Sequence, residues 1–143
     1  MNDKYFVDTN IFVYAHDRAA GAKHKRAAAL LEELWDSESG VLSTQVLQEL
    51  CVILRNKTSH PLSAEELRGL IYDYMSWEIV ANTPESILSA LEIEVRHRIS
   101  FWDALIVHAA EYSGAAVLYS EDLSHGHKYG SVRVLNPFLD SAT

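Results

Sequence analysis

Two apolar runs in the chain each end at acidic residues. Asp8 directly follows Tyr5-Phe6-Val7, and Glu121-Asp122 directly follows the run 116–120. Short apolar runs predict buried strands, and the carboxyl ends of parallel strands share one edge, where α/β proteins bind ligands. An ionised aspartate buried at such an edge needs a partner. The spacing therefore predicts a charged site there, and it leaves open whether Glu121 or Asp122 faces that site.

Two further acids lie on predicted helices. Asp103 stands three residues after Ser100, a spacing that resembles a capping box with Asp in place of Glu. Its neighbours Phe101 and Trp102 are apolar, which is an unusual setting for a carboxylate that only caps a helix. Glu49 borders the apolar face of its helix, although an outward surface glutamate is the usual explanation of that pattern.

Singly, the acids at the strand ends have structural explanations too. Asp8 could cap a short helix that begins near Ile11, and Asp122 could be a turn residue. Taken together, clustered carboxylates repel one another and burial raises their pKa values. A divalent cation removes both costs, and an all-oxygen ligand set suits Mg²⁺ or Mn²⁺. The chemistry that such a site implies is hydrolysis of a phosphodiester.

The elements that position these acids alternate along the chain. The expected strands are Tyr5–Val7, Val41–Leu42, Glu78–Ala81, Ala116–Ser120 and Val132–Leu135. The expected helices are His24–Ser37, one from Ser43 or Thr44 to about Arg55, Ser63 to about Met75, one that starts at Thr83-Pro84, and Ser100 to about Ser113. This alternation predicts a three-layer α/β/α domain with a mostly parallel central sheet. No repeat or linker interrupts the chain, so we expect a single domain over residues 1–143.

Composition excludes several classes of protein. The chain carries 12 Lys and Arg against 20 Asp and Glu, a formal net charge of −8, which argues against the usual basic nucleic-acid binder. A single cysteine, Cys51, excludes an internal disulfide and a multi-cysteine zinc site, and it favours a cytoplasmic protein. Its apolar neighbours predict that it is buried. Acids at Asp3 and Asp8 interrupt any apolar core of a signal peptide. No apolar run approaches a membrane span, so we expect no membrane partner.

The four acidic positions together resemble a known family. The matching segments are Asp8-Thr9-Asn10 after the first strand, Glu49, Trp102-Asp103-Ala104 at a helix start, and Ser120-Glu121-Asp122-Leu123. Together they resemble the PIN domain and, more narrowly, the VapC-type toxins of bacterial toxin–antitoxin systems. The resemblance covers nearly the whole chain, from Tyr5 to about Leu135, in the same order and spacing.

This resemblance implies a PIN-like fold and a Mg²⁺- or Mn²⁺-dependent endoribonuclease. It carries over Asp8 and Asp103 as direct metal ligands, and Glu49 as a residue that positions a ligand or water. Asp122 would complete the cluster or support a second metal ion. The supporting polar positions are Asn10 and Ser120. The expected partners, by the same analogy, are an RNA substrate, a cognate antitoxin protein and a second copy of the chain.

Basic residues gather near the predicted site despite the acidic total. Arg96 and Arg98 immediately precede the helix that carries Asp103. Cations stabilise the carboxyl end of a helix, which is the structural explanation of their position. The sharper hypothesis is that Arg96 and Arg98 contact RNA phosphates beside the metal.

Two other functions compete with the ribonuclease. An aspartyl-phosphate phosphatase or receiver domain also places an aspartate at the end of its first strand, but the phosphatase pattern needs a second aspartate where this chain has Asn10. Lys128 is a poor candidate for the lysine that a receiver needs. The second alternative is a non-catalytic PIN-like module that binds RNA or a partner. The intact set of four acids favours the enzyme over such a module.

Overall fold

The computed structural model describes residues 3–139, and its centre is a six-stranded sheet. The strands are β1 (Tyr5–Val7), β2 (Gly40–Ser43), β3 (Glu78–Val80), β4 (Val117–Tyr119), β5 (Lys128–Tyr129) and β6 (Val132–Leu135). Their order is β3-β2-β1-β4-β6-β5, and every pair is parallel except β5 with β6. The prediction of a mostly parallel sheet is therefore confirmed. The antiparallel β5 was not predicted, because a two-residue strand carries no periodic pattern.

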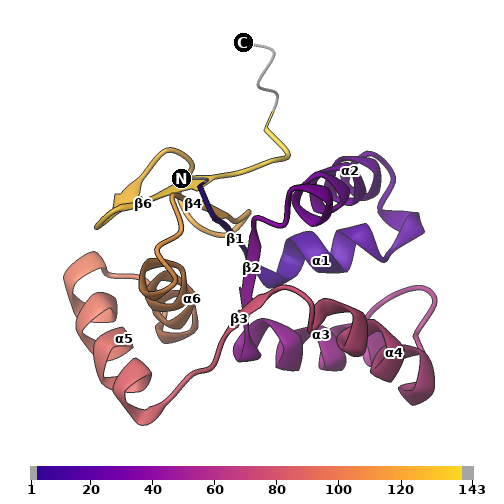
Figure 1. Cartoon of the computed structure of the whole chain (residues 1–143), viewed down its shortest axis with the longest axis horizontal. Coiled ribbons are helices and arrows are strands. Elements are labelled where there is room, and N and C mark those ends of the chain that lie inside the picture. The colour runs from indigo at the N-terminus through magenta and orange to yellow at the C-terminus, as the bar shows by residue number, and fades with distance from the viewer. Residues whose placement is uncertain (1–2, 140–143) are drawn as a thin grey trace.

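Helices cover both faces of this sheet (Figure 1). They are α1 (Thr9–Ala15), α2 (Ala22–Ser37), α3 (Thr44–Asn56), α4 (Ala64–Tyr74), α5 (Pro84–His97) and α6 (Phe101–Tyr112), with a 3₁₀ turn at Arg18–Ala20. In Figure 1, α5 and α6 lie on one side of the strands and α1 to α4 lie on the other. The structure thus has the three-layer α/β/α architecture that the sequence predicts. Among the described residues, no helix is both long enough and apolar enough to cross a bilayer.

The helix starts follow from adjacent residues. Ser63 and Glu66 form the predicted capping box at α4: each side chain accepts a hydrogen bond from the other residue's backbone amide. Thr83 caps α5 and Pro84 occupies its first position, as the sequence indicates. Ser43, rather than Thr44, caps α3. The short helix α1 begins at Thr9, directly after its cap Asp8, two residues earlier than we expected from the pattern.

Apolar side chains fill the space between the layers. In α6 the segment Ala104–Val107 is buried throughout against the sheet. On the other side, Phe12, Tyr74 and Trp77 pack ring against ring, with centroids 5.1 to 5.6 Å apart. Trp77 lies so close to Gly40 that a Cβ atom there would come within 2.4 Å of its ring. Glycine at the start of β2 is therefore a packing requirement.

Register brings the predicted acidic strand ends together. Val7 of β1 pairs with Tyr119 of β4, so both strands end at the same level. The backbone amide of Asp8 continues the ladder by donating to the carbonyl of Tyr119 at 2.9 Å. The residues after β1 and β4 consequently lie side by side at one edge of the sheet.

Candidate metal centre

Asp8 is the most buried acid of the predicted set. Its side chain caps α1 by accepting a hydrogen bond from the Thr9 amide at 2.7 Å, and its second oxygen accepts one from Ser120 Oγ at 2.9 Å. The residue is 5% exposed. Burial raises the pKa of Asp8 to about 7, and the charges of Asp122 and Glu49 add to that effect against the two hydrogen bonds. The capping and the functional interpretation of Asp8 are thus compatible.

Glu49 and Asp122 are each held by a polar side chain of α1. Thr9 Oγ1 donates to Glu49 Oε1 at 2.6 Å, and Asn10 Nδ2 donates to Asp122 Oδ2 at 2.9 Å. Burial raises the pKa of Asp122, as do the charges of other acids, that of Asp103 first. The first turn of α1 therefore orients carboxylates that come from α3 and from the turn after β4.

Asp103 stands in the first turn of α6, where Ser100 Oγ accepts a hydrogen bond from the Asp103 backbone amide at 3.1 Å. Its carboxylate is partly exposed and borders the same cavity as the other predicted acids. The residues that line this cavity are Asp8, Thr9, Asn10, Gln45, Glu49, Ile53, Trp102, Asp103, Ile106 and Asp122. All four sequence-predicted acids thus meet at one cavity, although they come from four separate segments of the chain.

The carboxylates surround the cavity instead of converging on one point. Within residues 3–139, no three His, Cys, Asp or Glu side chains are close enough to form a ready ligand cluster. A cation held by only one or two carboxylates and several waters needs no such cluster, and that is how Mg²⁺ usually binds. A buried acid with a raised pKa and a ring of oxygen donors fits a hard divalent cation.

Glu121 points away from the cavity, which answers the question that the sequence left open. Tyr14 Oη donates to Glu121 Oε1 at 2.7 Å, and Lys23 forms an ion pair with the other oxygen. Burial raises the pKa of Glu121, but the hydrogen bonds from Lys23 and Tyr14 outweigh it and the net direction is down. Asp122 therefore faces the cavity, while Glu121 anchors the turn to α1 and α2.

Sequence reasoning missed Gln45 and the role of Thr9. Gln45 is buried beside the acids, and its Nε2 donates to the backbone carbonyl of Trp102 at 3.2 Å. Its Oε1 is buried and has no hydrogen-bond partner among the described residues. The available signal was its place two residues after the end of β2, at the same edge of the sheet as Asp8. Ser120, which we had predicted as a supporting residue, bonds Asp8 directly.

Arg96 and Arg98 do not line the acidic cavity. Arg96 lies in the last turn of α5, and Arg98 follows that helix as its exposed C-cap with φ 54°, in the left-handed region. Both lie on the segment that leads into α6 and Asp103.

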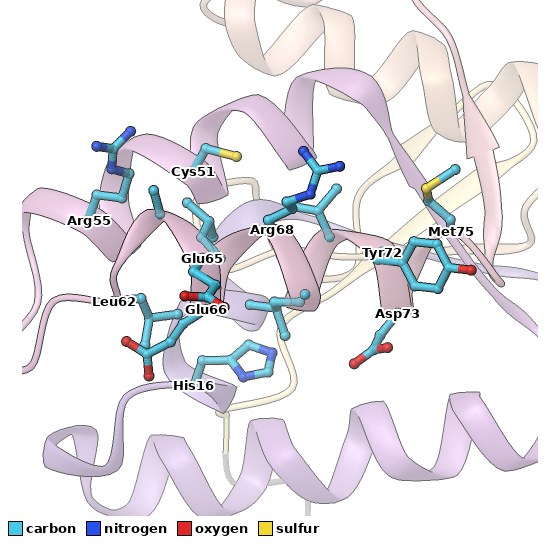
Figure 2. Close-up of a pocket in the computed structure, with 15 residues that line it drawn as sticks. His16, Cys51, Arg55, Leu62, Glu65, Glu66, Arg68, Tyr72, Asp73 and Met75 are labelled. Atoms are coloured by element: carbon cyan, nitrogen blue, oxygen red, sulfur yellow. The ribbon is translucent and has the colours of Figure 1, made fainter.

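A second and larger cavity lies between α3 and α4, and it contains none of the predicted acids (Figure 2). Arg55 and Cys51 border it from α3, while Arg68 and Tyr72 border it from α4. Cys51 is half-buried there and packs against the core, so the expectation of a buried cysteine is met only in part. The helix face that carries Cys51 is covered by α4 only in part.

The chain matches the family model of the PIN domain over residues 5–129. It therefore belongs to the PIN domain family. Among curated proteins it is similar to ribonuclease VapC24 of Mycobacterium tuberculosis, with 27% identity over 140 residues that cover 92% of this chain and 94% of that protein.

Solved structures share the fold. A structure of VapC20 from Mycobacterium tuberculosis, described as a sarcin-ricin loop cleaving toxin, has a TM-score of 0.64 at 24% identity and covers 83% of this chain and 90% of that one. A toxin–antitoxin complex from Klebsiella pneumoniae has a TM-score of 0.69 at 15% identity, with 94% of this chain and 98% of that one covered. At these identities the likeness supports the fold, and the α/β/α prediction is confirmed.

Proposed function

We propose that this protein is a Mg²⁺- or Mn²⁺-dependent endoribonuclease and the toxin of a toxin–antitoxin pair. The observation that carries the proposal is the single cavity at which Asp8, Glu49, Asp103 and Asp122 meet. Membership of the PIN domain family and the similarity to a protein named ribonuclease VapC24 support it.

The donor set suits a hard divalent cation and differs from a typical zinc site. All four acids offer oxygen, and among the described residues neither cysteine nor histidine borders the cavity. Asp8 and Asp103 would hold the cation, while Glu49 and Asp122 would position water or a second ion. When bound, the cation would stabilise charge that develops on the phosphodiester and lower the pKa of the attacking water.

The remaining polar residues pre-orient the acids. Ser120 and the Thr9 amide fix the two oxygens of Asp8, and Thr9 Oγ1 and Asn10 fix Glu49 and Asp122. Residues that hold ligands in this way commonly contribute about 10- to 100-fold to metal affinity or activity. The chain therefore orients three of the four acids by its own hydrogen bonds, and a bound cation would offset their mutual repulsion.

The proposed biological partners rest on the relatives. Similar solved structures include a toxin–antitoxin complex and a DNA-bound VapBC from Salmonella typhimurium. We infer an RNA substrate, a cognate antitoxin and a homodimer for this chain, in the cytoplasm where RNA and antitoxin are found. The non-catalytic binding module is the alternative, and a protein with four intact acids that fails to cut RNA would favour it.

Cleavage of RNA with and without a chelator tests the proposal. Purified protein should cut RNA with Mg²⁺ or Mn²⁺ and stop when EDTA is added. Asp103→Asn should abolish cutting and leave the far-ultraviolet circular dichroism spectrum unchanged, because Asp103 is partly exposed. Asp36→Asn, an exposed residue of α2 outside the cavity, is the matched control and should cut normally. Undiminished cleavage in EDTA would contradict the metal mechanism.

A further inference from the structure

Trp102 is the exposed residue on the first turn of α6, a helix whose middle is buried. Its side chain is 62% exposed, whereas Ala104–Val107, which follow it on α6, are buried. Burial of a tryptophan side chain removes a large apolar area from water. An exposed indole therefore offers a large apolar area to a ligand. The aromatic ring that packs against the Trp102 indole is that of the adjacent Phe101.

Trp102 lies at the rim of the acidic cavity. Trp102 and Asp103 line that cavity together. The Trp102 backbone carbonyl accepts a hydrogen bond from Gln45 Nε2 at 3.2 Å, which ties the start of α6 to α3. The Phe101 ring lies 5.4 Å from the indole, at an interplanar angle of 76°. An edge-to-face contact of this kind restricts the ring and leaves aromatic surface free.

A second group of rings lies on the segments next to α6. His97, at the end of α5, is 4.9 Å from the buried ring of Tyr129, and the exposed ring of His127 is 4.4 Å from the same tyrosine. Burial raises the pKa of Tyr129, and the charge of Asp103 adds to that rise. Ring side chains therefore also occur at the end of α5 and at the start of β5.

We propose that the Trp102 indole stacks on an unpaired nucleobase next to the phosphodiester that enters the acidic cavity. The inference rests on the proposed ribonuclease function and adds a specificity residue to it. Proteins that bind single-stranded RNA stack splayed bases on aromatic side chains. Trp102 borders the cavity that would receive the phosphate, and its side chain is 62% exposed, so a chain seated there brings a base within reach of the indole. A base-paired duplex would keep its bases stacked and inaccessible to the indole.

An abasic substitution tests this contact directly. The cleavage position in a single-stranded RNA is mapped first. Two modified RNAs are then made, each with one abasic nucleotide, on the 5′ or on the 3′ side of the cleaved bond. Stacking of one base on an aromatic side chain corresponds to roughly a 5- to 150-fold effect. We expect Trp102→Ala to raise KM for the intact RNA by about that factor, and the abasic RNA to show the same loss with the wild-type protein. With Trp102→Ala, the abasic position should cause no further loss.

Two variants serve as controls for this combination of protein variant and abasic RNA. Trp102→Phe keeps a ring and should restore most of the affinity. Tyr112→Ala removes a ring that is 76% exposed at the opposite end of α6, outside the cavity, and should cleave both RNAs as the wild type does. Both sites are exposed, so melting temperatures should stay close to that of the wild type. Additive losses for Trp102→Ala and the abasic RNA would overturn the proposal.

Fluorescence separates this proposal from the proposed function. Trp77 is 8% exposed and Trp35 is 39% exposed, and neither lines the acidic cavity. Addition of a short single-stranded RNA with Mg²⁺ should quench the wild-type emission, and Trp102→Phe should lose that quenching. If no RNA is cleaved, the ribonuclease proposal fails and this titration still tests the stacking. Absence of quenching would refute the stacking proposal. A Trp102→Ala protein that binds RNA normally but no longer binds its antitoxin would refute it too.

Discussion

Replacement of Asp8 by asparagine should stabilise the metal-free protein above neutral pH. Asp8 is buried, and its pKa is raised from 3.8 to about 7 in the folded state. For an acid with a raised pKa, the favourable contribution is complete below the unfolded value near 4 and is lost as pH rises to about 7. Above pH 7 the folded protein holds an ionised carboxylate among other acids, whereas Asp8→Asn has no charge there.

The size of the effect follows from the shift. Each unit of pKa is worth about 1.4 kcal/mol, so a rise of about 3 units costs the folded state about 4 kcal/mol at pH 8. For a domain of this size that corresponds to roughly 10 °C in melting temperature. The asparagine keeps one oxygen for the Thr9 amide. Its NH₂ group cannot accept the hydrogen bond that Ser120 Oγ donates to Asp8, and Ser120 Oγ already accepts from the Asp122 and Leu123 amides, so the loss of this bond offsets about 1 kcal/mol of the gain.

Thermal unfolding in EDTA, followed from pH 4 to pH 8, measures this difference. Asp8→Asn should melt above the wild type at pH 8, and the gap should close as pH falls toward 4. Added Mg²⁺ at 100 times its Kd should stabilise the wild type by about 2.7 kcal/mol and so raise its melting temperature. The melting temperature of Asp8→Asn should stay nearly unchanged. Asp36→Asn, at an exposed site, should follow the wild type throughout. A lower melting temperature for Asp8→Asn at pH 8, or an equal response of both proteins to Mg²⁺, would refute the reasoning.

Three further predictions use other parts of the molecule. Asp122→Asn should slow RNA cleavage by at least about tenfold. Glu121→Gln should cleave at the wild-type rate, because Glu121 bonds Tyr14 and Lys23 outside the cavity. Equal losses of both variants in a cleavage assay would contradict the assignment of Asp122 to the site. The pair Arg96→Ala and Arg98→Ala should reduce the salt dependence of RNA affinity by about 0.7 in log–log slope for each phosphate contact removed, and an unchanged slope would exclude them from the RNA interface. Glu38→Gly should raise the free energy of unfolding in urea by about 1 kcal/mol, because Glu38 caps α2 at φ 55°, where glycine is unstrained; a loss of stability would show that the Glu38 side chain matters more than its backbone.

Features that depend on neighbours in the chain were predictable. The capping box of Ser63 and Glu66 and the start of α5 at Pro84 involve residues at most three positions apart, so the sequence displays both partners together. The strand ends at Asp8 and Ser120 were also predictable, because apolar runs mark buried strands and parallel strands end at a shared edge. The same two rules are enough to assign Asp8 and the acids after Ser120 to one edge of the sheet.

Features that depend on distant residues were not predictable from local patterns. The pattern around Glu49 favoured a solvent-facing glutamate, and only the family resemblance placed it at the site; its side chain is held at the cavity by Thr9, 40 residues earlier in the chain. Glu121 and Asp122 have the same charge and adjacent positions, and no local pattern distinguishes them. The difference arises from Tyr14 and Lys23, which lie 107 and 98 residues away from Glu121 and bind it outside the cavity.

The sequence by itself determined which carboxylates are present and which edge of the sheet collects them, since strand periodicity and helix caps are local properties. Only the tertiary structure decided how those carboxylates behave. Burial of Asp8 raises its pKa to about 7, and the start of α6, tied to Gln45, places Trp102 at the rim of the cavity. Desolvation and side-chain direction depend on what packs around a residue, and in this chain that environment comes from segments far apart in the sequence.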